Sequence, residues 1–139
     1  MFGKKIISQP KPGAIGKWGE KQAERLLKSK RYRILGRRVR VGRRDELDLV
    51  ARADDDTLVF VEVKTRNRED FGRPSDAVDR AKRRTLSRAA VRYIQRLKTP
   101  PTFFRFDIVE VVGSMDDSQP ETRHVENAFP LDTRYTLPY

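Results

Sequence analysis

The segment from Val59 to Arg66, VFVEVKTR, constrains the fold of this chain more than any other stretch. Its β-branched and aromatic residues are typical of a strand inside a sheet, where side chains point alternately to opposite faces. Phe60, Glu62 and Lys64 therefore share one face, and valines occupy the other. Charges are costly to bury unless they are paired or bind a metal. The segment fits either a sheet edge, with both charges in water or ion pairs, or a functional site.

The periodicity of the rest of the chain predicts an α/β fold. Helices are expected over residues 13–30 and 75–97, and strands over residues 32–41 (broken near Gly36), 46–53, 57–66, 103–112 and, less regularly, 124–129. The acidic run at residues 54–56 predicts a hairpin between the second and third strands. The long helix before the fourth strand predicts a crossover, so that the third and fourth strands are parallel. We expect a mixed sheet flanked by helices.

Both helices carry an apolar stripe. In the second helix, Ser75 is expected to cap the start, where Asp76 and Asp79 suit the positive end of the helix dipole. The stripe of the first helix is expected to comprise Ile15, Gly19, Ala23, Leu26 and Leu27.

Length and composition favour one intracellular domain. The 139 residues correspond to a flexible N-terminal arm over residues 1–12 and one domain over residues 13–139, with a core at 16–112 and a tail at 113–139. The absence of cysteine excludes disulfides and thiolate metal sites. The chain has neither a secretory signal pattern nor an apolar run of membrane-spanning length. A cytoplasmic protein with no membrane partner is expected.

Charge favours a polyanionic partner. Lys and Arg number 31 against 20 Asp and Glu, a net charge of +11. Nucleic acid is the commonest polyanion and is the favoured partner, and the alternative is a basic protein from an organism whose proteins are rich in Arg. A solvated helix face is the alternative for the basic side of the second helix. The residues expected to contact nucleic acid are Arg80, Lys82, Arg83, Arg84, Arg88, Arg40 and Arg66.

Acidic residues also occupy the second predicted strand. Alternation places Glu46 with Asp48 on one face, and Leu47 with Leu49 on the other. Asp is disfavoured inside strands, so Asp48 calls for a reason. If this strand pairs with the third, Asp48 and Glu62 can meet on one face.

Glu20, at the edge of the first helix, could reach the same place. Divalent cations such as Mg²⁺ take a few carboxylates plus water and substrate phosphate, and they activate water for phosphodiester hydrolysis. A lysine such as Lys64 can orient that water or neutralise developing charge. Structural ion pairing is the alternative for Asp48, Glu62 and Lys64, and an ordinary carboxylate on the helix surface is the alternative for Glu20.

Asp48, Glu62 and Lys64 together resemble the D-(x)n-E-x-K signature of the restriction-endonuclease-like superfamily, the PD-(D/E)XK nucleases. The fuller pattern looks like the small YraN family within that superfamily. The segments that carry this resemblance are GKWGEKQAERLL, DELDLVARADDDTLVFVEVKTR, AVDRAKRRTLSRAAVRYI and FRFDIVEV.

The resemblance implies a restriction-endonuclease-like core, a central mixed β-sheet flanked by α-helices. It implies Mg²⁺ or Mn²⁺ bound by Asp48 and Glu62, with the Val63 carbonyl as a further ligand. Lys64 would assist the nucleophile. Glu20 would match the first-helix Glu of resolvase-like members that cut branched DNA, and Lys82 would support the site. By the same analogy, a homodimer would match two-fold substrates.

The chain departs from these patterns at two positions. Leu47 stands where the superfamily has Pro, and Asp45 stands where YraN-like sequences have Gly. An extra acid at position 45 would either alter metal binding or face water.

Three functions therefore remain open. The first is a metal-dependent nuclease acting on DNA rather than RNA, including branched DNA. The second is a non-catalytic nucleic-acid binder that keeps the fold, and the third is an assembly protein with an acidic partner. Four other side chains are expected to have structural roles: Trp18 in packing, Glu46 in water or paired with an Arg, Asp107 as the buried partner of a group such as an Arg, and His124 at the surface.

Overall fold

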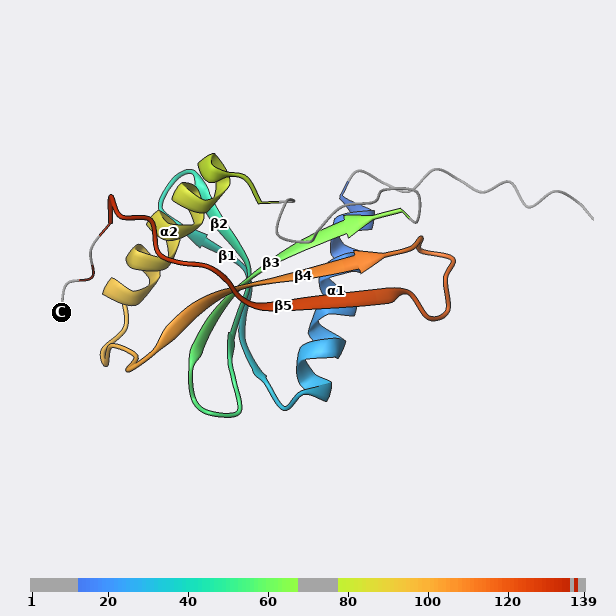
Figure 1. Cartoon of the computed structure of the whole chain (residues 1–139), viewed down its shortest axis with the longest axis horizontal. Helices are drawn as coiled ribbons and strands as arrows, with labels where there is room; N and C mark the ends of the chain where they lie inside the picture. Colours follow the sequence, from blue (N-terminus) through green and yellow to red (C-terminus); the bar gives the residue numbers. More distant parts are fainter. Residues whose placement is uncertain (1–12, 68–77, 136, 138–139) are drawn as a thin grey trace, which may run out of the picture.

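The computed structural model describes residues 13–67, 78–135 and 137. The chain folds in the order α1, β1, β2, β3, α2, β4, β5 (Figure 1). The elements are α1 (Ala14–Ser29), β1 (Arg33–Val41), β2 (Asp45–Arg52), β3 (Leu58–Arg66), α2 (Arg80–Gln95), β4 (Phe104–Val112) and β5 (Glu121–Phe129).

The five strands form one mixed sheet in the order β1-β2-β3-β4-β5. Neighbouring strands are antiparallel except β3 and β4, which are parallel and joined through α2. The predicted crossover and hairpin are therefore confirmed. The architecture is consistent with a restriction-endonuclease-like core.

The two helices pack on opposite faces of the sheet, and each face has its own apolar cluster. Phe60 and Phe106 pack with Leu86 and Ile94 of α2. On the other face, Val59, Val61 and other strand residues pack with Ala23 and Leu27 of α1. The alternation of the VFVEVKTR segment thus gives β3 two buried faces, as expected for a central strand.

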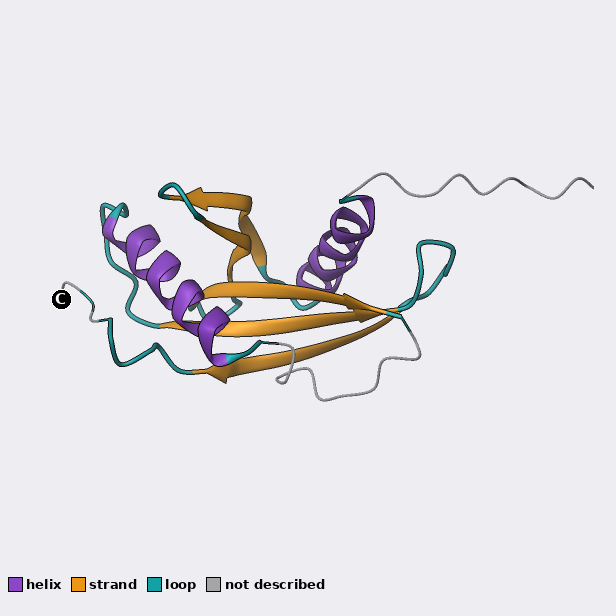
Figure 2. Ribbon diagram, turned by 90° about the horizontal axis from the view of Figure 1, so that it is seen from above, coloured by secondary structure: helices purple, strands orange, loops and turns teal. Residues whose placement is uncertain are grey.

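β2 and β3 are paired over only part of their lengths. Their register runs from Leu49↔Val61 to Arg52↔Leu58. Residues 45–47 of β2 pair with β1 alone, and residues 62–66 of β3 pair with β4 alone. We call the opening between residues 45–48 and residues 62–66 the β2–β3 fork. Figure 2 shows β1 and β2 curving away from the other three strands there.

β2 changes the direction of its side chains at the fork. Leu47 packs in the cluster with α2, whereas Leu49 packs in the cluster with α1. The prediction that Leu47 and Leu49 share one face is wrong, because the strand twists where it leaves β3.

Two predictions about the helices are also corrected. α2 begins at Arg80, and the side chain of Asp79 caps it by accepting a hydrogen bond of 2.8 Å from the backbone N–H of Lys82. Ser75, the expected cap, lies outside the described residues. In α1 the stripe is confirmed for its central residues, but Ile15 is 51% exposed because it lies at the helix start, beyond the sheet.

Gly19 permits α1 to approach β3 closely. A Cβ atom at this position would lie far inside the contact distance of Thr65 Oγ1. By contrast, a Cβ atom on Gly16 would lie 3.7 Å from its nearest neighbour, Arg38 Nη2, which is an ordinary contact.

Replacing Gly19 by Ala is expected to destabilise the fold by about 1–2 kcal/mol, because Thr65 or the whole helix must move. The matched variant Gly16→Ala should be neutral or gain up to about 1 kcal/mol, since Ala favours the helix. Chemical unfolding of both variants measures the difference. A Gly19→Ala protein as stable as Gly16→Ala would contradict the close approach.

Candidate active site

Asp48 and Glu62 lie on the two sides of the β2–β3 fork. The register Leu49↔Val61 places each one residue beyond the last paired position. Asp48 Oδ2 accepts a hydrogen bond of 2.9 Å from the backbone N–H of Val63, so the carboxylate bridges the opening. The two carboxyl groups are close enough for the charge of Asp48 to raise the pKa of Glu62. Asp48 is thus held next to the β3 segment that carries Glu62, as the predicted hairpin requires.

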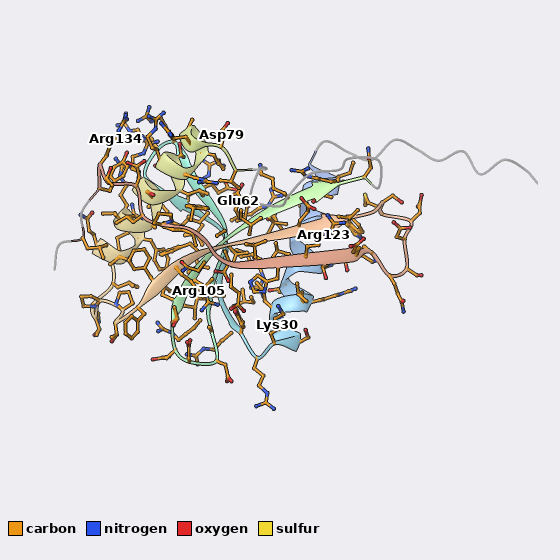
Figure 3. All side chains as sticks on the ribbon, viewed as in Figure 1. Lys30, Glu62, Asp79, Arg105, Arg123 and Arg134 are labelled. Carbon is orange, nitrogen blue, oxygen red and sulfur yellow. The ribbon has the colours of Figure 1, made fainter. Side chains whose placement is uncertain are left out.

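Glu62 is nearly buried, at 5% exposure, and faces two lysines. Its Oε1 lies 3.7 Å from Lys64 Nζ and 3.6 Å from Lys82 Nζ. Its Oε2 is also buried and has no hydrogen-bond partner within the described residues. In Figure 3, Glu62 lies between β3 and the start of α2, which explains why a lysine from each element reaches it.

Burial dominates the electrostatics of both acids. It raises the pKa of Glu62 to about 7, aided by the charge of Asp48 and opposed by Lys82 and Lys64. Burial also raises the pKa of Asp48, which the Val63 N–H opposes and the charge of Glu20 reinforces. Two adjacent carboxylates are thus held where ionisation is costly, as is common at functional sites.

Glu62→Gln is expected to stabilise the metal-free protein at pH 8. Because the folded-state pKa of Glu62 lies above the ordinary value of 4.5, ionisation penalises folding. The penalty is absent below pH 4.5 and complete above about pH 7. Thermal unfolding in EDTA should give a gain on the order of 2 kcal/mol at pH 8 and almost none at pH 4.5. A variant less stable than its parent at pH 8 would contradict this electrostatic account.

Glu20 lies beside this pair but is already engaged. Arg38 of β1 donates two hydrogen bonds to its carboxylate, Nε to Oε1 and Nη2 to Oε2, each 2.9 Å long. The sequence offered no signal for this partner. Over residues 13–67 and 78–135, no three Asp, Glu, His or Cys side chains form a group that could hold a metal ion. The role of Glu20 as a third ligand therefore stays a prediction.

The remaining donors at the fork fit a hard divalent cation. Asp48 and Glu62 offer carboxylate oxygens, which Mg²⁺ and Mn²⁺ prefer, and the carbonyl of Val63 belongs to the same strand segment. The buried Glu62 Oε2 lacks a partner in the described part of the chain, and a cation would supply one. A cation would also relieve the repulsion that raises the pKa of Glu62.

The basic residues expected to contact nucleic acid fall into two groups. Arg80, Arg83 and Arg84 line an open pocket of about 460 Å³ together with Arg134, which the sequence analysis did not identify. The others lie against acids, namely Lys82 at Glu62, Arg88 at Asp45, Arg66 at Glu110 and Arg40 at Glu46.

One alternative was that Asp45 faces water, and this alternative is wrong. It is buried, and Arg88 holds its carboxylate with two hydrogen bonds of 2.8 Å. This pair fixes α2 to the start of β2. Glu46, in contrast, is exposed and lies 3.9 Å from Arg40, which confirms its expected role.

A second polar cluster lies on the α1 side of the sheet, away from the fork. Asp107 is fully buried and pairs with Arg105 at 3.0 Å, as expected. The prediction of a surface role for His124 is wrong. Its side chain is 2% exposed and lies between two charged residues. Nε2 lies 2.8 Å from Asp107 Oδ2, and Nδ1 lies 2.9 Å from Lys30 Nζ.

Comparison with known proteins places the chain in a family. The model of a family described as "Uncharacterised protein family UPF0102" matches residues 19–111. The chain belongs to this family. The matched range contains all the acids and lysines of the fork, and the YraN-like resemblance is confirmed at this level. No solved structure shows a significant match.

Individual relatives are similar over almost their whole lengths. The UPF0102 protein of Symbiobacterium thermophilum is 44% identical over 83% of this chain and 95% of its own. Those of Caldicellulosiruptor saccharolyticus and Chlorobaculum tepidum are 39% and 38% identical, over 83% and 85% of this chain and 96% and 93% of their own. Within the described residues, no helix is long and apolar enough to cross a membrane.

Proposed function

We propose that this UPF0102 protein is a metal-dependent nuclease that hydrolyses phosphodiester bonds in DNA, branched or otherwise structured DNA included. The observation that carries the proposal is the fork itself. There, a buried glutamate faces an aspartate and two lysines, and one of its oxygens has no hydrogen-bond partner among the described residues. A purely structural ion pair has no need of a second, repelling carboxylate beside it.

The residues of the fork divide the chemistry among them. Asp48 and Glu62, with the Val63 carbonyl, would hold Mg²⁺ or Mn²⁺, and such an ion supplies a water of lowered pKa and stabilises charge on phosphoryl oxygens. Lys64, 3.7 Å from Glu62, is placed to orient the attacking water or to neutralise developing charge. Lys82 approaches from α2 and holds the same carboxylate oxygen of Glu62.

The DNA backbone is proposed to run along the start of α2. Lys82 belongs to the same helical turn as Arg80, Arg83 and Arg84, so the basic pocket and the fork are close together. Arg83 is held in place there, since its Nε donates a hydrogen bond of 3.0 Å to the Val78 carbonyl. Phosphate contacts of this kind orient a substrate but carry no sequence information.

Neutralising two of these arginines, as in Arg80→Gln/Arg84→Gln, should flatten the salt dependence of DNA binding. Each phosphate contact contributes about −0.9 to the slope of log affinity against log salt. The slope should therefore become less negative by about two units. Titration of a labelled duplex at several salt concentrations measures it. The control is Arg92→Gln/Arg96→Gln, with both changes on exposed residues at the other end of α2.

An unchanged slope would move the DNA path to β1, which carries Arg40. If low salt permits no binding to any nucleic acid, an assembly protein with an acidic partner becomes the better explanation.

A non-catalytic nucleic-acid binder is the second candidate. The bidentate pairing of Glu20 with Arg38 favours it, because that pairing withholds a third carboxylate from a metal.

The deciding experiment incubates the protein with linear duplex, single-stranded and four-way-junction DNA, each with Mg²⁺, Mn²⁺ or EDTA. Metal-dependent cleavage of any of them supports the nuclease. Binding to all three without cleavage in either metal supports the binder.

A further inference from the structure

A groove adjoins the fork on the α1 side of the sheet. It has a volume of about 600 Å³ and an open mouth, and residues of α1, β1 and β2 line it, together with Met115. Trp18, the one tryptophan of the chain, and Leu49 provide apolar surface within it. Trp18 also packs against the α1-side core, as predicted, but it is only half-buried.

The rim of the groove is basic. It carries Lys17, Lys21, Arg37 and Arg38, together with two glutamates. Arg37 and Arg38 are paired with those glutamates, at positions 24 and 20. Within the described residues, the side-chain ammonium groups of Lys17 and Lys21 have no hydrogen-bond or ion-pair partner. An apolar groove with two uncompensated ammonium groups at its mouth suits a ligand that combines an aromatic surface with negative charge.

The groove and the fork share walls. Leu49 lines the groove and directly follows Asp48 in β2. Glu20, the third carboxylate proposed for the fork, also lines the groove. A ligand in the groove therefore lies next to the carboxylates that would act on a phosphodiester.

We propose that this groove binds one unpaired nucleobase of the DNA substrate, which stacks on Trp18 while Lys17 and Lys21 contact the flanking phosphates. The inference deepens the proposed function, because it places an unpaired nucleotide beside the scissile bond. The substrate class is then DNA with a single-stranded flap, fork or bulge rather than continuous duplex. Stacking on an aromatic side chain tolerates any base, so no sequence preference is expected.

A base inside a duplex cannot enter such a groove. Both of its faces are covered by neighbouring bases, and extruding it costs a few kcal/mol. A base that is already unpaired avoids that cost. This difference gives the groove a way to distinguish branched from linear DNA without reading sequence.

Trp18 also supplies the measurement. Because the chain has a single tryptophan, tryptophan fluorescence that is excited selectively over its four tyrosines reports on this groove. Titration in EDTA, which prevents cleavage, compares a blunt duplex with the same duplex carrying a short single-stranded flap. We expect the flap to quench Trp18 fluorescence and to bind about ten-fold more tightly than the blunt duplex. Equal quenching and equal affinity for the two would overturn the inference.

Two variants separate stacking from packing. Trp18→Leu keeps the apolar contact with the core but cannot stack, so the preference for flapped DNA should fall to about two-fold or less. The affinities of the Trp18 variants are measured with labelled DNA, because these variants contain no tryptophan. Trp18→Phe should keep most of the preference. The control is Phe103→Leu, which changes a 70% exposed aromatic residue outside the groove and should leave the preference unchanged. Circular dichroism checks the fold of each variant, and if Trp18→Leu does not fold, the titration of the parent chain decides.

This design distinguishes the inference from the proposed function. A protein that prefers flapped DNA through Trp18 but never cleaves it supports the groove and refutes the nuclease. Cleavage at equal rates next to paired and unpaired bases, unaffected by Trp18→Leu, refutes the groove and supports the nuclease.

Discussion

Replacing Asp48 by Asn or Glu62 by Gln is expected to reduce metal-dependent DNA cleavage by about 100-fold or more, with binding close to that of the parent chain. Each substitution removes a charge that would hold the cation but keeps the shape of the side chain. Neither residue belongs to the basic pocket at the start of α2, so the contacts proposed for the DNA backbone remain.

The matched control for these variants is Glu46→Gln. Glu46 is a neighbour of Asp48 on the same strand, but it is exposed and only loosely paired with Arg40. The Glu46→Gln variant should therefore cleave DNA at a rate within about two-fold of that of the parent chain. The measurement is a single-turnover rate on the best substrate, with binding measured in parallel in EDTA. An Asp48→Asn protein that cuts as fast as its parent would exclude the proposed mechanism.

Arg88→Met is expected to destabilise the protein by about 3 kcal/mol, because it leaves the buried Asp45 without its partner. The carboxylate of Asp45 is 2% exposed and accepts both of its strong hydrogen bonds from Arg88. A loss of this size should lower the melting temperature by about 10 °C. Thermal and urea unfolding measure it.

The stability of the parent chain should also depend on pH through the Asp45–Arg88 pair. The hydrogen bonds of Arg88 lower the pKa of Asp45, opposed by its burial. Its contribution to stability is therefore complete above the ordinary pKa of aspartate, about 3.9, and is lost as pH falls through the lowered value.

Two controls accompany Arg88→Met. Arg92→Met changes an exposed arginine one turn later and should cost less than about 0.5 kcal/mol. The double variant Asp45→Asn/Arg88→Met should recover part of the loss, since no buried charge remains. If Arg88→Met instead kept full stability and weakened DNA binding, Arg88 would be a phosphate contact, as its position in the sequence first indicated.

The fold was predictable from the sequence because its signals are local. Strand alternation and the helical stripes predicted both helices and the first four strands, whereas β5 begins at Glu121 rather than at residue 124 as expected. The crossover length predicted the parallel pair. The start of α2 was missed, since several acidic and hydroxyl residues near it are equally good caps, and only the structure selects Asp79.

The site was predictable where two strands were enough to define it. Asp48 and Glu62 follow from alternation and one hairpin. The partners of Glu20, Asp45 and His124 did not follow. Each is brought in from a distant part of the chain, and pairing between distant charges leaves no periodic trace. The single histidine gave no sign that Lys30 and Asp107 would enclose it.

Among the described strands, β1 is a border of the sheet, and its outer side offers backbone groups that another strand could pair with. Exposed arginines occupy this border at positions 33, 37, 38 and 40. Three of these arginines are paired with glutamates, but the border keeps a net positive charge, and two copies meeting there would repel each other. The homodimer that the resemblance implies would then need another surface. A polyanion bound along this border would remove the repulsion and with it the protection against self-association.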